Sequence, residues 1–147
     1  MEHEEYMRQA LELARLAMAE GEVPVGCVIV RDGAVVGRGR NRRETAQTAL
    51  GHAELEAIAQ ACRTLGGWRL AGCALYVTLE PCPMCAGAIV NARIPAVYYG
   101  AKDDKAGCCG SVLNLFEERF NHHPRIYGRG LEAECAALLQ EFFQSLR

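Results

Sequence analysis

The chain lacks a long apolar run and an excess of charge of either sign. No stretch approaches the ~18 consecutive apolar residues that a transmembrane helix needs, and the acidic residues 1–5 (MEHEE) do not resemble a secretory signal peptide. We therefore expect a soluble, cytoplasmic protein with no membrane partner. With 16 basic and 18 acidic residues and a formal net charge of −2, the chain as a whole is not a polybasic nucleic-acid binder, although a local basic patch is enough to contact phosphates.

Internal repeats, low-complexity tracts and linkers are also missing, so residues 1–147 are expected to form a single domain. Cysteine, by contrast, is abundant. In a reducing cytoplasm the eight cysteines are expected to be mostly free thiols. Their spacing therefore indicates metal binding or catalysis before it indicates disulfides.

The hydrophobic pattern predicts a helix, a hairpin, and then alternating helices and strands, which indicates an α/β domain with a mixed sheet and helices on both faces. The first predicted elements are a helix at 4–20 and two strands at 25–30 and 34–39 around the turn Asp32-Gly33. A helix at 52–65 follows, with Leu55, Ile58, Ala59 and Cys62 on one face, and then a buried strand at 73–79 and a helix opened by Pro81. The last predicted elements are strands at 96–101 and 125–127 and a closing helix at 132–146.

Two short segments carry the chemistry: His52-Ala53-Glu54, and Cys82 with Cys85 in a Cys-x-x-Cys turn that follows a predicted strand. Zinc binds imidazole nitrogen and thiolate sulfur, and a Cys-x-x-Cys turn lets two sulfurs reach one tetrahedral ion. A helix N-terminus favours the thiolate form. The pattern therefore predicts a zinc ion on His52, Cys82 and Cys85.

Three protein ligands leave one tetrahedral position of zinc open to water, whose pKa the metal lowers toward ~7. Glu54, two residues after His52, lies near such a metal without binding it. A carboxylate there can take a proton from water and return it to a ring nitrogen and a leaving amine. This division of roles predicts a hydrolytic deaminase.

Other readings of these residues stay open. The Cys-x-x-Cys pair is also typical of a thioredoxin-like redox centre, and Cys62 or Cys73 is a possible fourth ligand of a closed structural zinc site. Glu54 alone is ordinary for the first turn of a helix. A deaminase of a free base, guanine or cytosine, would use the same zinc motif.

The combined motif resembles the zinc nucleobase deaminases, and the chain resembles the bacterial tRNA-specific adenosine deaminases over about residues 6–143. The segments that carry this resemblance are 22–26 (EVPVG), 75–80 (LYVTLE), 84–89 (MCAGAI), 99–103 (YGAKD), 107–111 (GCCGS), 120–122 (FNH) and 134–139 (ECAALL). The chain departs from the family before His52, where Asp-Pro-Thr-Ala is common and residues 47–51 read QTALG.

The resemblance implies a three-layer α/β/α cytidine-deaminase-like fold around a mixed five-stranded sheet, and a homodimer. It also implies conversion of the wobble adenosine of a tRNA anticodon stem-loop to inosine. His52, Cys82 and Cys85 would hold one Zn²⁺ per chain, with Glu54 as proton shuttle. Asn41 would bind the flipped purine, and backbone N–H groups near Ala53 and Cys82 would steady the purine ring or the metal-bound oxygen. Without the resemblance, the alternative for Asn41 is a turn or capping residue after the second strand.

The remaining candidates concern RNA contact. Asp103 is expected to accept from a ribose hydroxyl, unless it is only an exposed loop acid. The candidates for phosphate contact are Arg38, Arg40, Arg42, Arg43, Lys102, Lys105 and Arg125. A solvated surface is the alternative for each of these charges. Cys108 and Cys109 are expected to pack within their loop.

Overall fold

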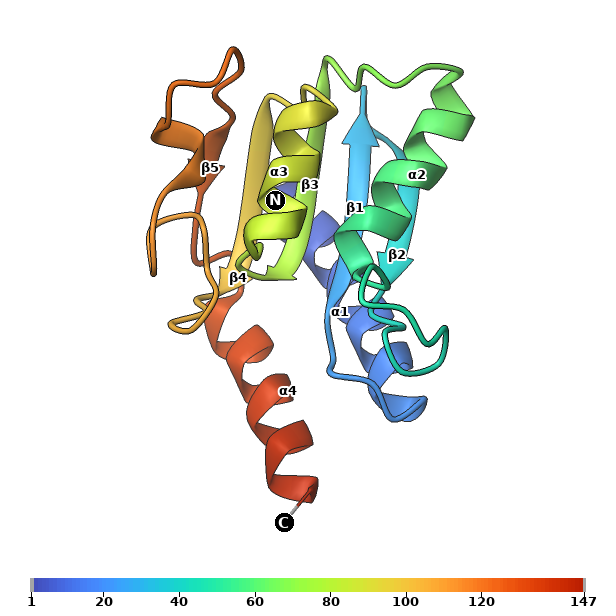
Figure 1. Ribbon diagram of the computed structural model, residues 1–147. Helices are drawn as coiled ribbons and strands as arrows, with labels where there is room; N and C mark the ends of the chain where they lie inside the picture. Colours follow the sequence, from blue (N-terminus) through green and yellow to red (C-terminus); the bar gives the residue numbers. More distant parts are fainter. Residues whose placement is uncertain (1, 147) are drawn as a thin grey trace.

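A computed structural model describes residues 2–146 and places four helices and five strands in chain order (Figure 1). The elements are α1 (Glu2–Ala19), β1 (Gly26–Arg31), β2 (Ala34–Arg40), α2 (Ala53–Leu65), β3 (Cys73–Leu79), α3 (Pro83–Asn91), β4 (Ala96–Ala101), the short 3-10 turn η1 (Leu115–Glu117), β5 (Arg125–Tyr127) and α4 (Glu132–Ser145). In the described part of the chain, no helix has the length and apolar character of a membrane span.

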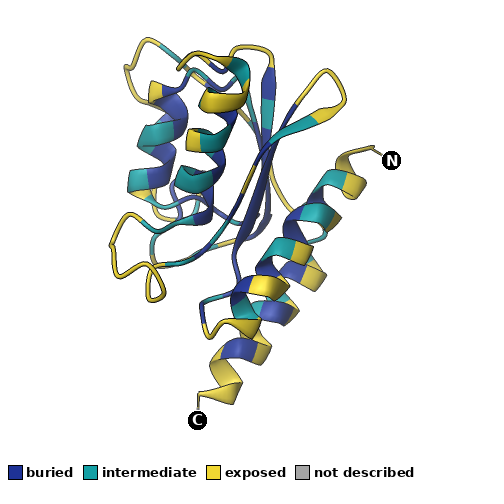
Figure 2. Cartoon of the chain, turned by 90° about the vertical axis from the view of Figure 1, so that its right-hand side faces the viewer, coloured by how far each residue is buried: buried dark blue, intermediate teal, exposed yellow. Residues whose placement is uncertain are grey.

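The strands form one mixed sheet in the order β2-β1-β3-β4-β5. β1 pairs antiparallel with β2 and β3, whereas β3–β4 and β4–β5 are parallel. Helices α2 and α3 cover one face and α1 and α4 the other, with a buried core on each side (Figure 2). The predicted three-layer α/β/α architecture is confirmed, and the strands agree with the predicted ranges to within a residue.

The β1–β2 connection is the predicted two-residue turn. Asp32 and Gly33 have φ of 51° and 78°, the left-handed values that a type I′ hairpin turn needs at both central positions. The prediction that Pro81 opens the third helix is wrong by two residues. Cys82 is the N-cap of α3 and Pro83 occupies its first turn, where a missing N–H costs nothing.

Leu55, Ile58, Ala59 and Cys62, which the sequence places on one face of α2, do not form the face against the sheet. The residues that face the sheet are Ala53, Glu54, Ala57 and Ala61, while Ala59 is exposed. The reason is the very close approach of α2 to β2: a Cβ on Gly37 would collide with the carbonyl oxygen of Ala57, and one on Gly39 with that of Ala53. Only small side chains fit this contact, so the larger apolar residues lie on the flank of α2.

This close contact predicts a large effect of one methyl group. Gly39→Ala should lower the free energy of unfolding by about 1–3 kcal/mol, since an overpacked site must displace backbone. Gly67→Ala is the matched control, because no atom lies within 4 Å of a Cβ at that position, and it should change stability by less than ~0.5 kcal/mol. Urea denaturation measures both. Equal stability of the two variants would contradict the close packing of α2 on β2.

Candidate metal centre and pocket

The N-termini of α2 and α3 lie at the same end of the sheet (Figure 1). His52 is the N-cap residue of α2 and Cys82 that of α3, with Cys85 in the first turn of α3. Both cap residues are extended, at φ/ψ of −94°/147° and −77°/175°, and neither side chain caps its own helix. Their side chains are therefore free to turn toward each other.

The structure brings the three predicted ligands together. The Nδ1 atom of His52 lies 3.7 Å from the Sγ of Cys82 and 3.5 Å from that of Cys85, and all three ligand atoms lie within 4.8 Å of one another. A tetrahedron with zinc–sulfur bonds of about 2.3 Å and zinc–nitrogen bonds of about 2.05 Å has S···N edges of roughly 3.6 Å. The nitrogen, the two sulfurs and their spacing thus fit zinc.

The protonation of the cluster also favours a cation. A hydrogen bond from Cys85 is the main cause that lowers the pKa of the Cys82 thiol to about 4, and a second comes from His52. The same contact raises the pKa of Cys85, and the bond to Cys82 raises the pKa of His52. Cys82 is therefore already a thiolate at neutral pH, whereas Cys85, whose pKa is raised, must release its proton when a cation binds.

Glu54 lies beside this cluster in the first turn of α2 and is only 4% exposed. Burial raises the pKa of its carboxyl to about 7, although a backbone hydrogen bond opposes the shift. A carboxyl with this pKa exists in both protonation states near neutrality. It can accept a proton and return it without a large free-energy cost in either direction.

A cavity of about 220 Å³ opens onto the cluster. Its base is formed by the start of α2 and the N-cap of α3. One wall comes from the segment before β1 and the loop after β2, the other from the end of β3 and the loop after β4. The lining residues are Val23, Val25, Asn41, Arg43, His52, Ala53, Glu54, Leu79, Glu80, Cys82, Asp103 and Ala106.

Six of the seven predicted site residues therefore line one cavity, and the seventh, Cys85, is buried beside His52. Asn41 and Asp103, on opposite walls, each also hold their own loop. The side-chain amide of Asn41 donates to Val23 O at 3.1 Å and its oxygen accepts from Arg43 N at 3.2 Å. The carboxylate of Asp103 accepts from the N–H groups of Lys105 and Ala106 at 3.1 and 3.2 Å.

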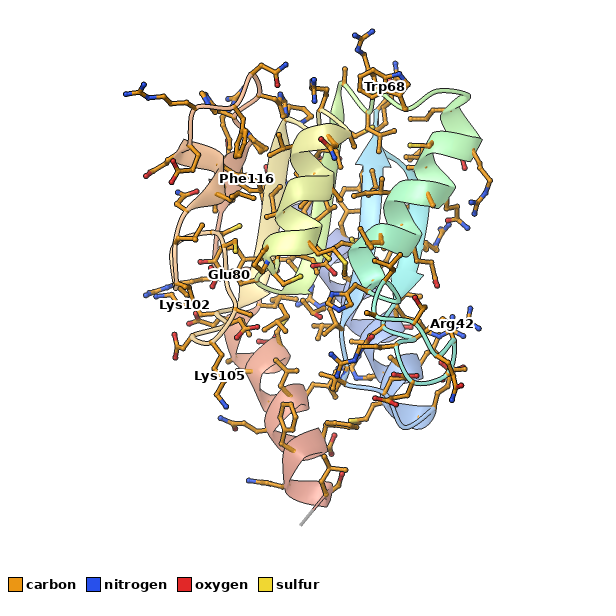
Figure 3. All side chains as sticks on the ribbon, viewed as in Figure 1. Arg42, Trp68, Glu80, Lys102, Lys105 and Phe116 are labelled. Carbon is orange, nitrogen blue, oxygen red and sulfur yellow. The ribbon has the colours of Figure 1, made fainter. Side chains whose placement is uncertain are left out.

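The basic candidates are more scattered than the sequence suggests. Arg43 lines the cavity. Arg40 instead pairs with Glu20 through two hydrogen bonds of 2.8 and 3.1 Å, and Arg38 lines a separate hollow along α1. Figure 3 shows Arg42, Lys102 and Lys105 at the end of the molecule where α2 and α3 begin.

The other cysteines do not join the cluster. Among the described residues, the group of possible metal ligands consists of His52, Cys82 and Cys85, so the structure offers no fourth protein ligand from Cys62 or Cys73. Cys73 belongs to the core under α2 and α3, and so do Cys108 and Cys109. The packing predicted for these cysteines is confirmed, and the three-ligand site keeps an open position.

Sequence reasoning missed two buried acids beside the cavity. Glu22 and Glu80 are 1% and 2% exposed, and their carboxylates accept hydrogen bonds from the two loops that form the walls. The sequence does carry one sign that these acids are buried. Each acid borders an apolar segment that includes a proline (EVPV and LEPC), and a charge that is buried there needs hydrogen-bond partners.

The donor set predicts one zinc ion per chain in purified protein, measured by metal analysis. Cys82→Ser should lose that zinc, because an alcohol oxygen is a poor ligand at neutral pH. Cys62→Ser is the control, since Cys62 lies outside the ligand group, and it should retain the metal. Purified protein without zinc, or retention in Cys82→Ser, would contradict the assignment.

The whole chain, residues 1–147, matches the family model of the MafB19-like deaminases. It is 50% identical over 143 residues to a tRNA-specific adenosine deaminase of Bacillus subtilis (strain 168), covering 97% of this chain and 89% of that protein.

The chain is also similar to a structure from studies of A-to-I editing by tRNA:A34 deaminases at the wobble position of transfer RNA. The TM-score is 0.88, with 44% identity over 91% of this chain and 98% of the other. A guanine deaminase from Bacillus subtilis has a TM-score of 0.68 and 35% identity over 100% of this chain and 94% of the other. The chain belongs to the tRNA-specific adenosine deaminases, among the MafB19-like deaminases.

Proposed function

We propose that the protein deaminates the wobble adenosine of a tRNA anticodon to inosine by hydrolysis. The observation that carries this proposal is the buried Glu54 beside a three-member ligand set, at the base of a cavity of about 220 Å³. Relatives at 44–50% identity supply the substrate, because they are tRNA-specific adenosine deaminases and tRNA:A34 deaminases. The whole chain, residues 1–147, acts as one catalytic domain, and its tRNA substrate places the enzyme in the cytoplasm.

His52, Cys82 and Cys85 would hold the zinc ion. When bound, zinc supplies a water of lowered pKa and so a nucleophile at neutral pH. The ligands come from the N-terminal turns of two packed helices, which hold them in place before substrate arrives.

Glu54 moves the protons. Its carboxylate takes a proton from the attacking water and delivers it to the ring nitrogen next to the reacting carbon. It then takes the second proton, from the hydroxyl now on that carbon, and gives it to the amine, which leaves as ammonia while the carbonyl of inosine forms. The pKa of about 7 suits both halves of this cycle. Burial at 4% exposure keeps bulk water from competing for the proton.

The walls of the cavity hold the base. A duplex hides the reacting edge of adenine, so an unpaired anticodon base must turn out of its loop to enter. Asn41 keeps one amide hydrogen beyond its bond to Val23 O and offers it to the purine. Ala53 presents the first backbone N–H of α2, and Asp103 lies on the opposite wall, where we assign it the ribose hydroxyl.

The decisive test is inosine formation in an anticodon stem-loop RNA with adenosine at the wobble position. Wild-type protein should produce inosine at that position alone. Glu54→Gln should retain one zinc per chain and lose activity by at least about 100-fold, the usual size of a lost general acid–base. Inosine is measured by nuclease digestion and chromatography.

Two other outcomes are informative. Loss of zinc or of the fold in Glu54→Gln would make Glu54 structural. Absence of inosine with zinc-loaded wild-type protein would favour a free-base deaminase, and guanine would be the substrate to test because a guanine deaminase is 35% identical.

We also propose a homodimer formed through α2 and α3. Leu55, Ile58, Ala59 and Cys62 lie on the flank of α2 and are part-buried or exposed. Helix α3 (PMCAGAIVN) has no charged residue, and its outer face presents Met84, Gly87 and Ala88 to solvent at least in part. The apolar flank of α2 beside the uncharged outer face of α3 is typical of a surface that is covered by another subunit.

Light scattering after size-exclusion chromatography should therefore give twice the chain mass of 16.1 kDa. Ala88→Glu places a charge on the outer face of α3 and should yield a monomer. Gln140→Glu adds the same charge at an exposed position of α4, on the opposite face of the sheet, and should leave the dimer intact. A monomeric wild-type protein, or an unaffected Ala88→Glu dimer, would exclude this interface.

A further inference from the structure

Two buried carboxylates hold the two walls of the cavity in place, one on each side. We propose that Glu22 and Glu80 are paired positioning residues that set the opening of the cavity and thereby the affinity for RNA. This inference rests on the proposed function and adds to it how substrate access is fixed. Neither residue carries a step of the deamination.

The carboxylate of Glu80 is fully occupied by the loop after β4. Its Oε1 accepts from Asp103 N at 3.1 Å and from Ser111 Oγ at 2.5 Å, and its Oε2 accepts from Cys109 N at 2.8 Å and Ser111 N at 3.1 Å. Four donors use the roughly four acceptor sites of a carboxylate. Glu80 therefore has no lone pair left for a metal ion, a proton or the substrate, although it borders the cavity.

The loop is shaped to lie on this carboxylate. Gly107 sits against it so closely that a Cβ there would collide with the carboxyl carbon of Glu80. The loop has little regular structure of its own between β4 and η1, so Glu80 replaces the backbone partners that a strand or helix would provide. By fixing Asp103 and Ser111, Glu80 fixes the wall formed by Asp103 and Ala106.

Glu22 does the same for the opposite wall. Its carboxylate accepts from Glu44 N at 3.1 Å, Thr45 N at 2.5 Å and Thr45 Oγ1 at 2.6 Å. The adjacent Val23 accepts from the side chain of Asn41. Glu22 thus ties the loop after β2, with Arg43, to the segment before β1, and both segments line the cavity.

The walls and the chemistry are held by different contacts. His52, Glu54, Cys82 and Cys85 belong to the starts of α2 and α3, which pack on the sheet, whereas the carboxylates of Glu22 and Glu80 bind donors of the two loops. Releasing a loop should therefore weaken RNA binding while the zinc and proton chemistry persist. A variant that binds the substrate and the transition state more weakly by the same amount has a higher KM and an unchanged kcat.

The experiment compares Glu22→Gln and Glu80→Gln with wild-type protein and with Glu141→Gln, an exposed acid on α4. An amide keeps the shape of the side chain but turns N–H donors toward the loop's own donors. We expect KM for the anticodon stem-loop to rise about tenfold or more, the cost typical of a misplaced binding group. The kcat value should change less than about threefold, zinc should stay at one per chain, and Glu141→Gln should match wild type.

Amide hydrogen exchange supplies a readout that does not depend on activity. Glu80→Gln should speed exchange in residues 103–111 only, and Glu22→Gln in residues 42–51 only. If either variant does not fold, Ser111→Ala and Thr45→Val remove one hydroxyl bond each and should shift KM the same way by less.

A fall in kcat at constant KM, a loss of zinc, or unchanged exchange in the loops would each overturn the positioning role. The proposed function fails separately, if zinc-loaded wild-type protein forms no inosine. The exchange of the two loops would then still decide whether Glu22 and Glu80 hold them.

Discussion

The contact of α2 with β2 determines where the catalytic groups stand. Gly37 and Gly39 let the backbone of α2 rest directly on the strand, which fixes the position of the first turn of α2 and with it His52 and Glu54. The strand β3 delivers Cys82 and Cys85 to the same end of the sheet. Helix dipoles favour anions at N-termini, and the start of α3 holds Cys82, whose pKa is lowered to about 4, whereas burial at the start of α2 raises the pKa of Glu54 to about 7.

Most of the fold was predictable because its signals are local. The hairpin turn at Asp32-Gly33 and the apolar run at 73–79 depend on neighbouring residues, and the structure confirms both. The His-x-Glu and Cys-x-x-Cys spacings likewise predicted the residues that meet around the cavity. The sequence did not identify the alanine face of α2 that packs on the sheet, because this packing depends on Gly37 and Gly39 of β2.

Glu22 and Glu80 could not be assigned from the sequence for a different reason. Their partners are backbone N–H groups 22 to 31 residues away, and a backbone donor leaves no trace in residue identity. The same limit applies to the bonds that Asn41 makes with Val23 and Arg43. These bonds are compatible with its predicted role as a purine ligand. Among the basic candidates, the pairing of Arg40 with Glu20 was also not evident from the sequence, because the two residues lie 20 positions apart.

The proposed function assigns chemistry and recognition to different parts of the fold. A guanine deaminase with 35% identity has a similar fold, although guanine and a tRNA adenosine differ greatly in size. The candidate zinc ligands and Glu54 lie on packed helix starts, which hold such groups more precisely than loops do. The loops after β2 and β4 are irregular, and a buried carboxylate holds each of them together with bonds within the loop. Because loops tolerate changes of length and sequence better than packed helices, a fold of this kind can accept a different base by changing the loops and keeping the helix starts.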